Sequence, residues 1–237
     1  MVHYETKRIA LVTGGNRGLG LETCRQLGKL GFTVLLSARN ISDGKRMVKQ
    51  LISDGLDVIF CRLDVTNQQD LNRAKSEIEL AYEHLDILIN NAAILYDSFQ
   101  TTVDADLEIV NQAFTTNFFG PWRVCKAFIP MMLKNKYGRI VNVSSQAGSL
   151  YYMNEGGTPG YSISKVALNA LTRKLAAEVR GTGILVNSVD PGWVATDLGG
   201  FGGRPVNEGV KGIVWAATLP PDGPTGGFFF DSNPEPW

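Results

Sequence analysis

Residues 9–20 read Ile-Ala-Leu-Val-Thr-Gly-Gly-Asn-Arg-Gly-Leu-Gly, an apolar run that passes directly into a glycine-rich turn. The apolar part is typical of a buried strand, and the amphipathic stretch 18–30 is typical of a helix. Glycines permit a tight turn and a close approach of backbone to a pyrophosphate, and a helix N-terminus supplies free N–H donors. Between a strand and a helix, this turn predicts a dinucleotide site formed by Gly14, Asn16, Arg17, Gly18, Leu19 and Gly20.

The same alternation of short apolar and longer amphipathic runs continues along the chain. About seven runs are predicted as strands: 9–13, 32–37, 58–62, 87–90, 140–143, 184–189 and 228–230. The predicted helices are 18–30, 42–54, 67–84, 103–134 with a kink at Gly120-Pro121, 161–180 and 206–218. This alternation predicts an α/β fold, a single-domain Rossmann-type doubly wound parallel sheet with helices on both faces. We expect residues 1–237 to form this one domain and residues 231–237 to be irregular.

Composition argues against several classes of function. The chain has 237 residues, and 23 basic side chains balance 23 acidic ones, which argues against binding to nucleic acid or an anionic membrane. With only two His, a His-rich metal site is not expected, and we predict no metal. The three Cys form no CxxC pair, so we expect reduced thiols in or near the core. Because no apolar run reaches about 18 residues and the start lacks a signal-peptide core, we expect a cytoplasmic protein.

The residues just after the second predicted strand, Ala38 and Arg39, bear on the choice between NAD and NADP. An NAD site places Asp or Glu there to accept from the ribose 2′-hydroxyl, whereas a 2′-phosphate favours Arg. The sequence has Arg39 and no acid at this point, and Arg17 in the glycine turn could supply a second cation. Guanidinium groups bind phosphate oxygens in a bidentate geometry. We therefore predict NADPH or NADP+ as cofactor, with two solvated surface arginines as the alternative.

A Tyr–Lys pair offers acid–base chemistry in place of His. Tyr161 and Lys165 lie four residues apart at the start of a predicted helix and therefore share one face. A nearby ammonium favours the phenolate and should lower the pKa of the Tyr161 phenol toward a useful range. Ser144 and Ser145 follow the strand 140–143, at the end where open α/β sheets place their active sites.

These motifs, in this order, resemble the short-chain dehydrogenase/reductase family over essentially the whole chain. They are 13–20, Asp64-Val65, Asn90-Asn91-Ala92-Ala93, Asn117, Ser145, Tyr161 with Lys165, and Pro191-Gly192. Within the family, the Gly-Gly-Asn-Arg-Gly turn, the Ala-Arg after the second strand and the Gly-Pro-Thr-Gly-Gly-Phe-Phe tail ending in Trp are most similar to NADPH-dependent carbonyl reductases. The resemblance implies reduction of ketones or aldehydes to alcohols by hydride transfer from NADPH.

The resemblance also implies a role for each matched residue. Tyr161 is the general acid, and Ser145 rather than its neighbour Ser144 orients the carbonyl oxygen. Lys165 and Asn117 form the proton relay, and Lys165 also binds the nicotinamide ribose. The remaining implied cofactor contacts are Asp64, Val65, Asn91, Ala92, Pro191, Gly192, Val194 and Thr196.

The predicted substrate pocket is less closely tied to motifs. Its candidate residues are Ser145, Tyr161, Trp193, Gln146 and Tyr96, with Leu150, Tyr152, Met153 and Phe201 as further members. Residues 150–157 are expected to form a loop at this pocket. The glycine-rich segment 198–205 occupies the region of the family's substrate lid, and its shortness predicts an open site for apolar ketones or aldehydes of varied size.

Two other functions remain open at this point. A 3-oxoacyl thioester reductase has the same motifs and would usually carry a basic patch for an acidic carrier protein. A catalytically dead NADPH sensor or scaffold is expected to lack part of the Asn-Ser-Tyr-Lys set. Relatives pair through surfaces equivalent to 103–134 and to the helix that begins at Tyr161, so we expect a homo-oligomer, either a dimer or a tetramer.

Overall fold

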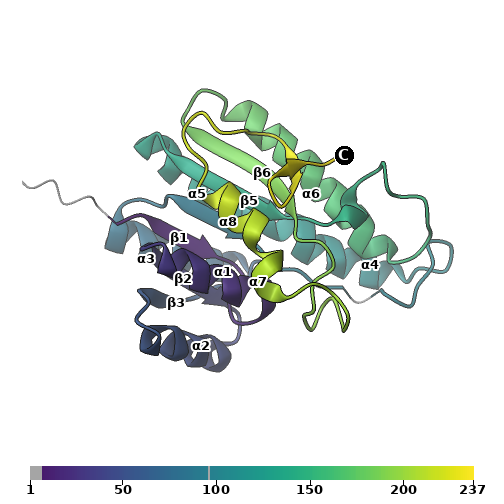
Figure 1. The fold of residues 1–237 in the computed structure, drawn as a ribbon, viewed down its shortest axis with the longest axis horizontal. Helices are drawn as coiled ribbons and strands as arrows, with labels where there is room; N and C mark the ends of the chain where they lie inside the picture. Colours follow the sequence, from purple (N-terminus) through teal and green to yellow (C-terminus); the bar gives the residue numbers. More distant parts are fainter. Residues whose placement is uncertain (1–6, 96) are drawn as a thin grey trace, which may run out of the picture.

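A computed structural model describes residues 7–95 and 97–237, and one mixed sheet runs through it (Figure 1). Its strand order is β3-β2-β1-β4-β5-β6-β7-β8; all neighbouring strands are parallel except the antiparallel pair β7 and β8. The strands are β1 (Ile9–Val12), β2 (Thr33–Ala38), β3 (Val58–Arg62), β4 (Ile87–Asn90), β5 (Gly138–Val143), β6 (Ile184–Asp190), β7 (Phe228–Phe230) and β8 (Asn233–Pro234).

Helices cover both faces of this sheet. On one face lie α1 (Gly18–Lys29), α2 (Ile41–Ser53) and α8 (Lys211–Ala217), with the short α7 (Val206–Gly209) packed beside α1 and α8. On the other face lie α3 (Gln68–Tyr82), α4 (Leu107–Phe114), α5 (Gly120–Asn135) and α6 (Pro159–Glu178). Two short turns complete the elements, the π-helical η1 (Thr115–Phe119) and the 3₁₀-helical η2 (Gln146–Gly148). The predicted doubly wound α/β fold is therefore confirmed.

The central strands are buried along their whole length, as expected for parallel strands covered on both sides. Every residue of β1, β2, β4 and β5 is buried. Their side chains alternate between two apolar layers, so Leu11 and Leu88 face α3 and α5 while Val12 and Ile89 face α1 and α8. This two-sided burial explains why continuous apolar runs predict these strands well.

Three segments differ from their predicted structure. The predicted helix 103–134 begins only at Leu107, where the Asp106 side chain accepts from the Glu108 N–H, and it passes through η1 before α5. The predicted helix 206–218 is divided into α7 and α8. The tail, predicted to be irregular, contains β8, because Asp231 has a φ of 53° and turns the chain back against β7.

The strand order reverses beside β1, whose neighbours β2 and β4 lead the chain in opposite directions across the sheet. At such a point the loops diverge and leave a crevice beyond the carboxyl ends of the strands. The long connections after β4, β5 and β6 gather at this end, on the right of Figure 1. No helix within the described residues is long and apolar enough to cross a membrane.

Candidate active site

A cavity of about 940 Å³ extends along the carboxyl ends of the strands, from the glycine turn to the segment after β8. It brings together nearly all residues singled out in the sequence. Those in its wall are Gly14, Asn16, Arg17, Gly18, Leu19, Gly20, Arg39, Asp64, Val65, Asn91, Ala92, Ser145, Gln146, Tyr161, Lys165, Pro191, Gly192, Trp193, Val194 and Thr196. Asn117 lies behind the wall, and Tyr96 is outside the described residues.

The glycine turn has the shape that a pyrophosphate requires. Gly14 and Gly18 have φ values of 63° and 52°, which disfavour other residues, and a Cβ on Gly20 would collide with the Gly14 carbonyl oxygen. Asn91 fastens the turn to the end of β4, because its Nδ2 donates to the carbonyl oxygens of Thr13 at 2.9 Å and Gly14 at 3.1 Å. The N-cap of α1, Arg17, makes no side-chain cap hydrogen bond, so the first N–H groups of α1 face the cavity without a cap.

Two arginines line the same end of the cavity. Arg39 is exposed and follows β2 directly. Arg17 is also exposed, and its Nη1 forms an ion pair with Asp197 Oδ2 at 3.0 Å. The predicted pair of cations is thus present, although Arg17 shares its charge with an acid from the segment after β6.

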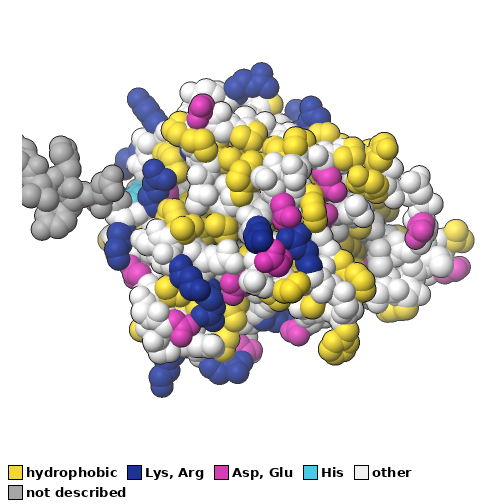
Figure 2. Space-filling view, in the orientation of Figure 1, with side chains coloured by type: hydrophobic (Ala, Val, Ile, Leu, Met, Phe, Trp, Pro, Cys, Tyr) yellow, Lys and Arg dark blue, Asp and Glu magenta, His cyan; other side chains and the backbone are white. Residues whose placement is uncertain are grey.

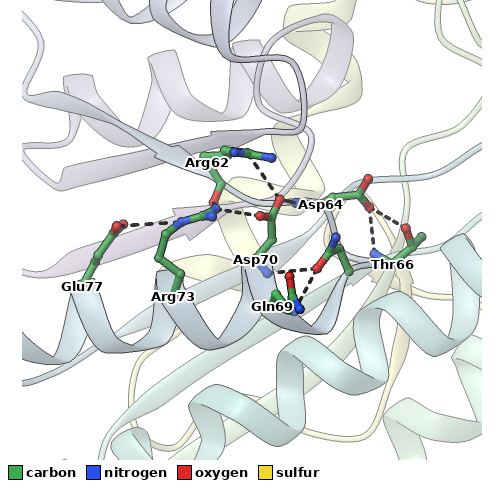
Figure 3. Close-up of polar contacts among 8 residues, drawn as sticks. Arg62, Asp64, Thr66, Gln69, Asp70, Arg73 and Glu77 are labelled. Atoms are coloured by element: carbon green, nitrogen blue, oxygen red, sulfur yellow. Dashed lines mark hydrogen bonds and ion pairs between the residues drawn. The ribbon is translucent and has the colours of Figure 1, made fainter.

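A network of charged groups fixes the loop after β3, which carries Asp64 and Val65 (Figure 3). The Asp64 carboxylate accepts from the N–H of Thr66 at 2.9 Å and from its hydroxyl at 2.7 Å. Behind it, the buried Asp70 accepts from the Asp64 N–H at 3.2 Å and pairs with Arg73 at 2.9 Å. These contacts hold Asp64 and Val65 in the cavity wall on the side of Arg39.

The first turn of α6 positions the Tyr–Lys pair. Asp97 is fully buried, and its Oδ2 accepts from the backbone N–H groups of Gly160 at 2.6 Å and Tyr161 at 3.2 Å. One turn further on, Lys165 is buried, and its Nζ donates to the Val143 carbonyl oxygen at 2.7 Å. The Lys165 Nζ also lies 5.5 Å from the centre of the Tyr161 ring. The shared helix face predicted from the spacing is therefore present.

Burial shifts both pKa values away from the charged forms. It raises the pKa of Tyr161 to about 12, although a hydrogen bond with Ser145 works in the other direction. It lowers the pKa of Lys165 to about 8, against the attraction of Asp190. The expected lowering of the Tyr161 pKa by Lys165 is not found: burial and the charge of Asp190 raise that pKa, and the hydrogen bond with Ser145 opposes them. At neutral pH the Tyr161 phenol keeps its proton, which a general acid needs.

The geometry favours Ser145 over Ser144. Ser145 lies two residues after β5 and is the N-cap of η2, where its Oγ accepts from the Ala147 N–H at 3.2 Å; its side chain also bonds with Tyr161. Ser144 is 2% exposed, and its Oγ has no hydrogen-bond partner among the described residues. Of the two serines, only Ser145 forms a hydrogen bond with the Tyr161 side chain.

Asn117 sits in the π-helical turn η1 and is fully buried. Its Oδ1 accepts from the Ile94 N–H at 2.8 Å, and its Nδ2 donates to the Ile94 carbonyl oxygen at 2.9 Å and to Ser164 Oγ at 3.1 Å. Asn117 therefore links the loop after β4 to Ser164 of α6, the residue that precedes Lys165.

The substrate end of the cavity contains Trp193 and Gln146, as predicted. Of the further candidates, Leu150, Tyr152, Met153 and Phe201 do not belong to its wall; Leu150 is 66% exposed and Phe201 fully exposed. The segment 198–205 folds back on Trp193, whose Nε1 donates to the Gly199 carbonyl oxygen at 2.7 Å. The loop 150–157 contacts the tail instead, where the Tyr151 N–H donates to the Trp237 carbonyl oxygen at 3.0 Å.

The residues of this end that sequence reasoning missed include Asp190, Arg204 and Glu235. Asp190 is buried at the end of β6, and its Oδ1 accepts from the Gly192 N–H at 2.9 Å. Its position directly before Pro191-Gly192 is a signal that could have identified it. Glu235 offered no such signal, because the tail carries no regular pattern.

Two comparisons of sequence agree with the resemblance to the short-chain dehydrogenase/reductase family. A model of the short chain dehydrogenase family matches residues 8–202. Carbonyl reductase (NADPH) 1 of Mus musculus is 32% identical, over 98% of this chain and 99% of that protein. Carbonyl reductase (NADPH) 3 of Rattus norvegicus is 34% identical, over 91% and 92% of the two chains.

Solved structures agree with this assignment. The NADPH-bound carbonyl reductase from chicken fatty liver has a TM-score of 0.87 at 29% identity and covers 98% of this chain and 99% of its own. Salutaridine reductase from Papaver somniferum has a TM-score of 0.81 at 29% identity, over 95% and 100% of the two chains. With a cavity that joins the glycine turn to Ser145, Tyr161 and Lys165, the chain belongs to the short chain dehydrogenase family of oxidoreductases.

Proposed function

We propose that the protein reduces ketones and aldehydes to alcohols with NADPH, and that residues 1–237 act as one NADP-binding domain. The observation that carries this proposal is the single cavity with the glycine turn and Arg39 at one end and Ser145, Tyr161 and Lys165 at the other. The names of the carbonyl reductases to which the chain is similar support both the cofactor and the reaction class.

The cavity wall fits a phosphorylated dinucleotide. The uncapped N-terminus of α1 and the glycine turn suit a pyrophosphate, and Arg17 and Arg39 suit a 2′-phosphate. Asp64, Val65, Asn91 and Ala92 would hold the adenosine half, and Pro191, Gly192, Val194 and Thr196 the nicotinamide half. When bound, the cofactor supplies hydride to the carbonyl carbon.

The protein's own side chains would hold the carbonyl oxygen and protonate it. Ser145 donates to that oxygen, and Tyr161 donates the proton, because burial keeps its phenol neutral. Such donors stabilise the negative charge that develops on oxygen as the carbonyl is reduced. Lys165, held by the Val143 carbonyl oxygen, would return a proton to Tyr161, and Asn117 would position a water that resupplies Lys165 with a proton from solvent. Gln146, Trp193 and Tyr96 would contact the rest of the substrate.

The first test is Tyr161→Phe, assayed for NADPH consumption over ketones, aldehydes, quinones and 3-oxoacyl thioesters. We expect turnover to fall by about 10²- to 10⁴-fold, the usual contribution of a general acid, while NADPH still binds. Tyr152→Phe is the matched control, since Tyr152 is exposed outside the cavity wall. Unchanged turnover in Tyr161→Phe, or turnover of thioesters alone by the wild type, would contradict the proposal.

Two finer points remain part of the proposal. We place the protein in the cytoplasm, supported by three buried free thiols at Cys24, Cys61 and Cys125. We also propose a homo-oligomer assembled through α4, α5 and α6. The visible face in Figure 2 mixes Lys and Arg with Asp and Glu, which gives no support to a carrier-protein patch there.

A further inference from the structure

The strands β5 and β6 separate at the reacting end of the cavity, and one buried side chain spans the gap between them. Their parallel pairing reaches Val143 beside Val189, and the Ser144 N–H adds a bond to the Val189 carbonyl oxygen at 2.7 Å. Beyond this bond, the chain enters η2 after β5 and the turn Pro191-Gly192 after β6. The last residue of β6 is Asp190, which is 3% exposed and lies in the cavity wall.

The Asp190 carboxylate accepts hydrogen bonds from both of the diverging segments. Its Oδ1 accepts from the Gly192 N–H at 2.9 Å, and the carboxylate also accepts from the backbone N–H of Gln146. Gln146 is the first residue of η2 and shares a peptide bond with Ser145, the N-cap of that turn. One side chain therefore joins the peptide next to Ser145 to the turn that is proposed to flank the nicotinamide.

The surroundings of Asp190 support the ionised form that these two bonds require. Burial raises the pKa of Asp190, whereas the N–H groups of Gly192 and Gln146 and the charge of Arg204 lower it; the charge of Asp231 raises it again. Hydrogen bonds to a charged acceptor are shorter and stronger than those between neutral groups. The carboxylate is thus well suited to hold two segments of backbone at a fixed separation.

Other contacts hold η2 to α6 and to the tail. Asn169 Nδ2 of α6 donates to the Gly148 carbonyl oxygen at 3.0 Å, and Ser149 Oγ donates to the Pro236 carbonyl oxygen at 2.8 Å. The Gln146 side chain bonds with Glu235 of the tail. Since these contacts do not involve Asp190, we expect its replacement to shift the start of η2 while the loop stays folded.

We propose that Asp190 is a positioning residue for carbonyl reduction, because it fixes Ser145 relative to the turn Pro191-Gly192. This inference rests on the proposed function, since it assigns a further residue to the same site. Asp190 acts through the N–H groups of Gln146 and Gly192 and need not touch substrate or cofactor. Its effect is geometric: the carbonyl oxygen held by Ser145 and the nicotinamide site keep one relative placement, and rates depend steeply on such alignment.

The first test is Asp190→Asn, which replaces one acceptor oxygen by an NH₂ donor, so that one of the two N–H groups loses its acceptor. We expect kcat to fall about 10- to 100-fold with KM unchanged, as for an interaction that aligns the transition state. Asp86→Asn is the matched control: Asp86 is buried directly before β4, and its Oδ2 accepts from the Ile9 N–H at 2.7 Å. Both variants should lose stability in denaturant, but only Asp190→Asn should lose kcat. A wild-type kcat in Asp190→Asn, or equal losses in both variants, overturns the inference.

A second pair of variants tests the same contact with Asp190 intact. Gln146→Pro removes the N–H that Asp190 accepts, and proline is tolerated at the first position of a helical turn. Gln146→Ala removes the same side chain but keeps the N–H. We expect kcat of Gln146→Pro to be about 10-fold or more below that of Gln146→Ala. Equal kcat values in these two variants refute the inference.

Two measurements without turnover separate this inference from the proposed function. NADPH affinity, followed by fluorescence titration, should be similar in wild type and Asp190→Asn, because the glycine turn and Arg39 lie at the other end of the cavity; a loss as large as that of kcat overturns the inference. Amide hydrogen exchange at Gln146 or Gly192 should be about tenfold faster in Asp190→Asn, since a bond to a charged acceptor is lost. Unchanged exchange refutes the inference. A wild type that reduces no carbonyl, with exchange that responds, refutes the proposed function instead.

Discussion

Burial shifts the pKa values of individual side chains in this site, upward for acids and downward for bases. The pKa of Tyr161 rises and that of Lys165 falls, because the interior disfavours a charge of either sign. Asp190 and Glu235 follow the same rule, with pKa values raised first of all by burial. The site therefore holds its acids in the protonated form more readily than water would.

Glu235 should leave a signature in the pH dependence of stability. Its pKa rises from 4.5 to about 7 on folding, so between these values the folded chain keeps a proton that the unfolded chain has lost. Stability then decreases as pH rises through this window. Glu235→Gln cannot titrate, so its Tm relative to wild type should increase from pH 4.5 to pH 7. Thermal melts across this range would show it; a difference that stays flat contradicts the assignment.

Residues that serve a backbone geometry or a fixed helix spacing were predictable from the sequence. Gly14, Gly18 and Gly20 appear as a motif because the turn tolerates no side chain there, and Tyr161 with Lys165 appears as a spacing of one helix turn. Glu235 was not predictable, because its place in the cavity depends on contacts between the tail and residues far away in the chain. The apolar candidates Leu150 and Phe201 failed for the same reason, since loop packing decides which aromatic or aliphatic side chains reach a pocket.

At the scale of elements, the carboxylate of Asp97 joins the loop after β4 to the start of α6. An acid at a helix N-terminus is stabilised by the N–H groups and by the helix dipole. Because the Asp97 carboxylate also accepts from the Tyr161 N–H, the same contact helps to position the Tyr161 side chain, the proposed proton donor, in the cavity wall. The sequence shows a helix from Tyr161, but it does not show this anchor, which lies 64 residues away from Tyr161.

Replacing this anchor should affect both folding and catalysis. Asp97→Ala and Asp106→Ala each remove a carboxylate that accepts from the first turn of a helix, α6 or α4. Each should lower stability by about 1 kcal/mol, the usual effect of a lost cap. Only Asp97→Ala should lower kcat more than it raises KM, because only α6 carries Tyr161. Denaturant unfolding and steady-state kinetics test this; equal kcat in both variants would refute a positioning role for Asp97.

At the scale of the whole molecule, one outer surface stands out because it carries exposed aromatic side chains. On the side of α4 and α5, aromatic rings cluster around η1, with Phe118 4.9 Å from Phe119 and 5.4 Å from Trp122 between ring centroids. Phe119 is 41% exposed and Trp122 44% exposed, so this cluster presents contiguous apolar surface to solvent. The doubly wound layering followed from the alternation of apolar runs, whereas a surface for assembly could be predicted only through resemblance.

This surface yields a prediction about assembly. We expect the wild type to elute as a dimer or tetramer in size-exclusion chromatography with light scattering, and Trp122→Lys to shift it toward monomer. Lys at this point brings a charge that must be desolvated in any apolar contact. Leu80→Lys, an exposed apolar residue on α3, is the control and should not change the mass. A monomeric wild type at micromolar concentration would contradict the prediction.

The ion pair between Arg17 and Asp197 has a consequence for the choice of cofactor. Asp197 pairs with one of the two arginines that suit a 2′-phosphate, so the chain contains its own competitor for that charge. If Arg17 turns to the phosphate, Asp197 is released, and with it the start of the segment 198–205 that folds over Trp193. NADH, which lacks the 2′-phosphate, would leave Arg17 of the glycine turn paired with Asp197 of the segment after β6. Discrimination between NADPH and NADH would then be expressed at the substrate entrance as well as in affinity.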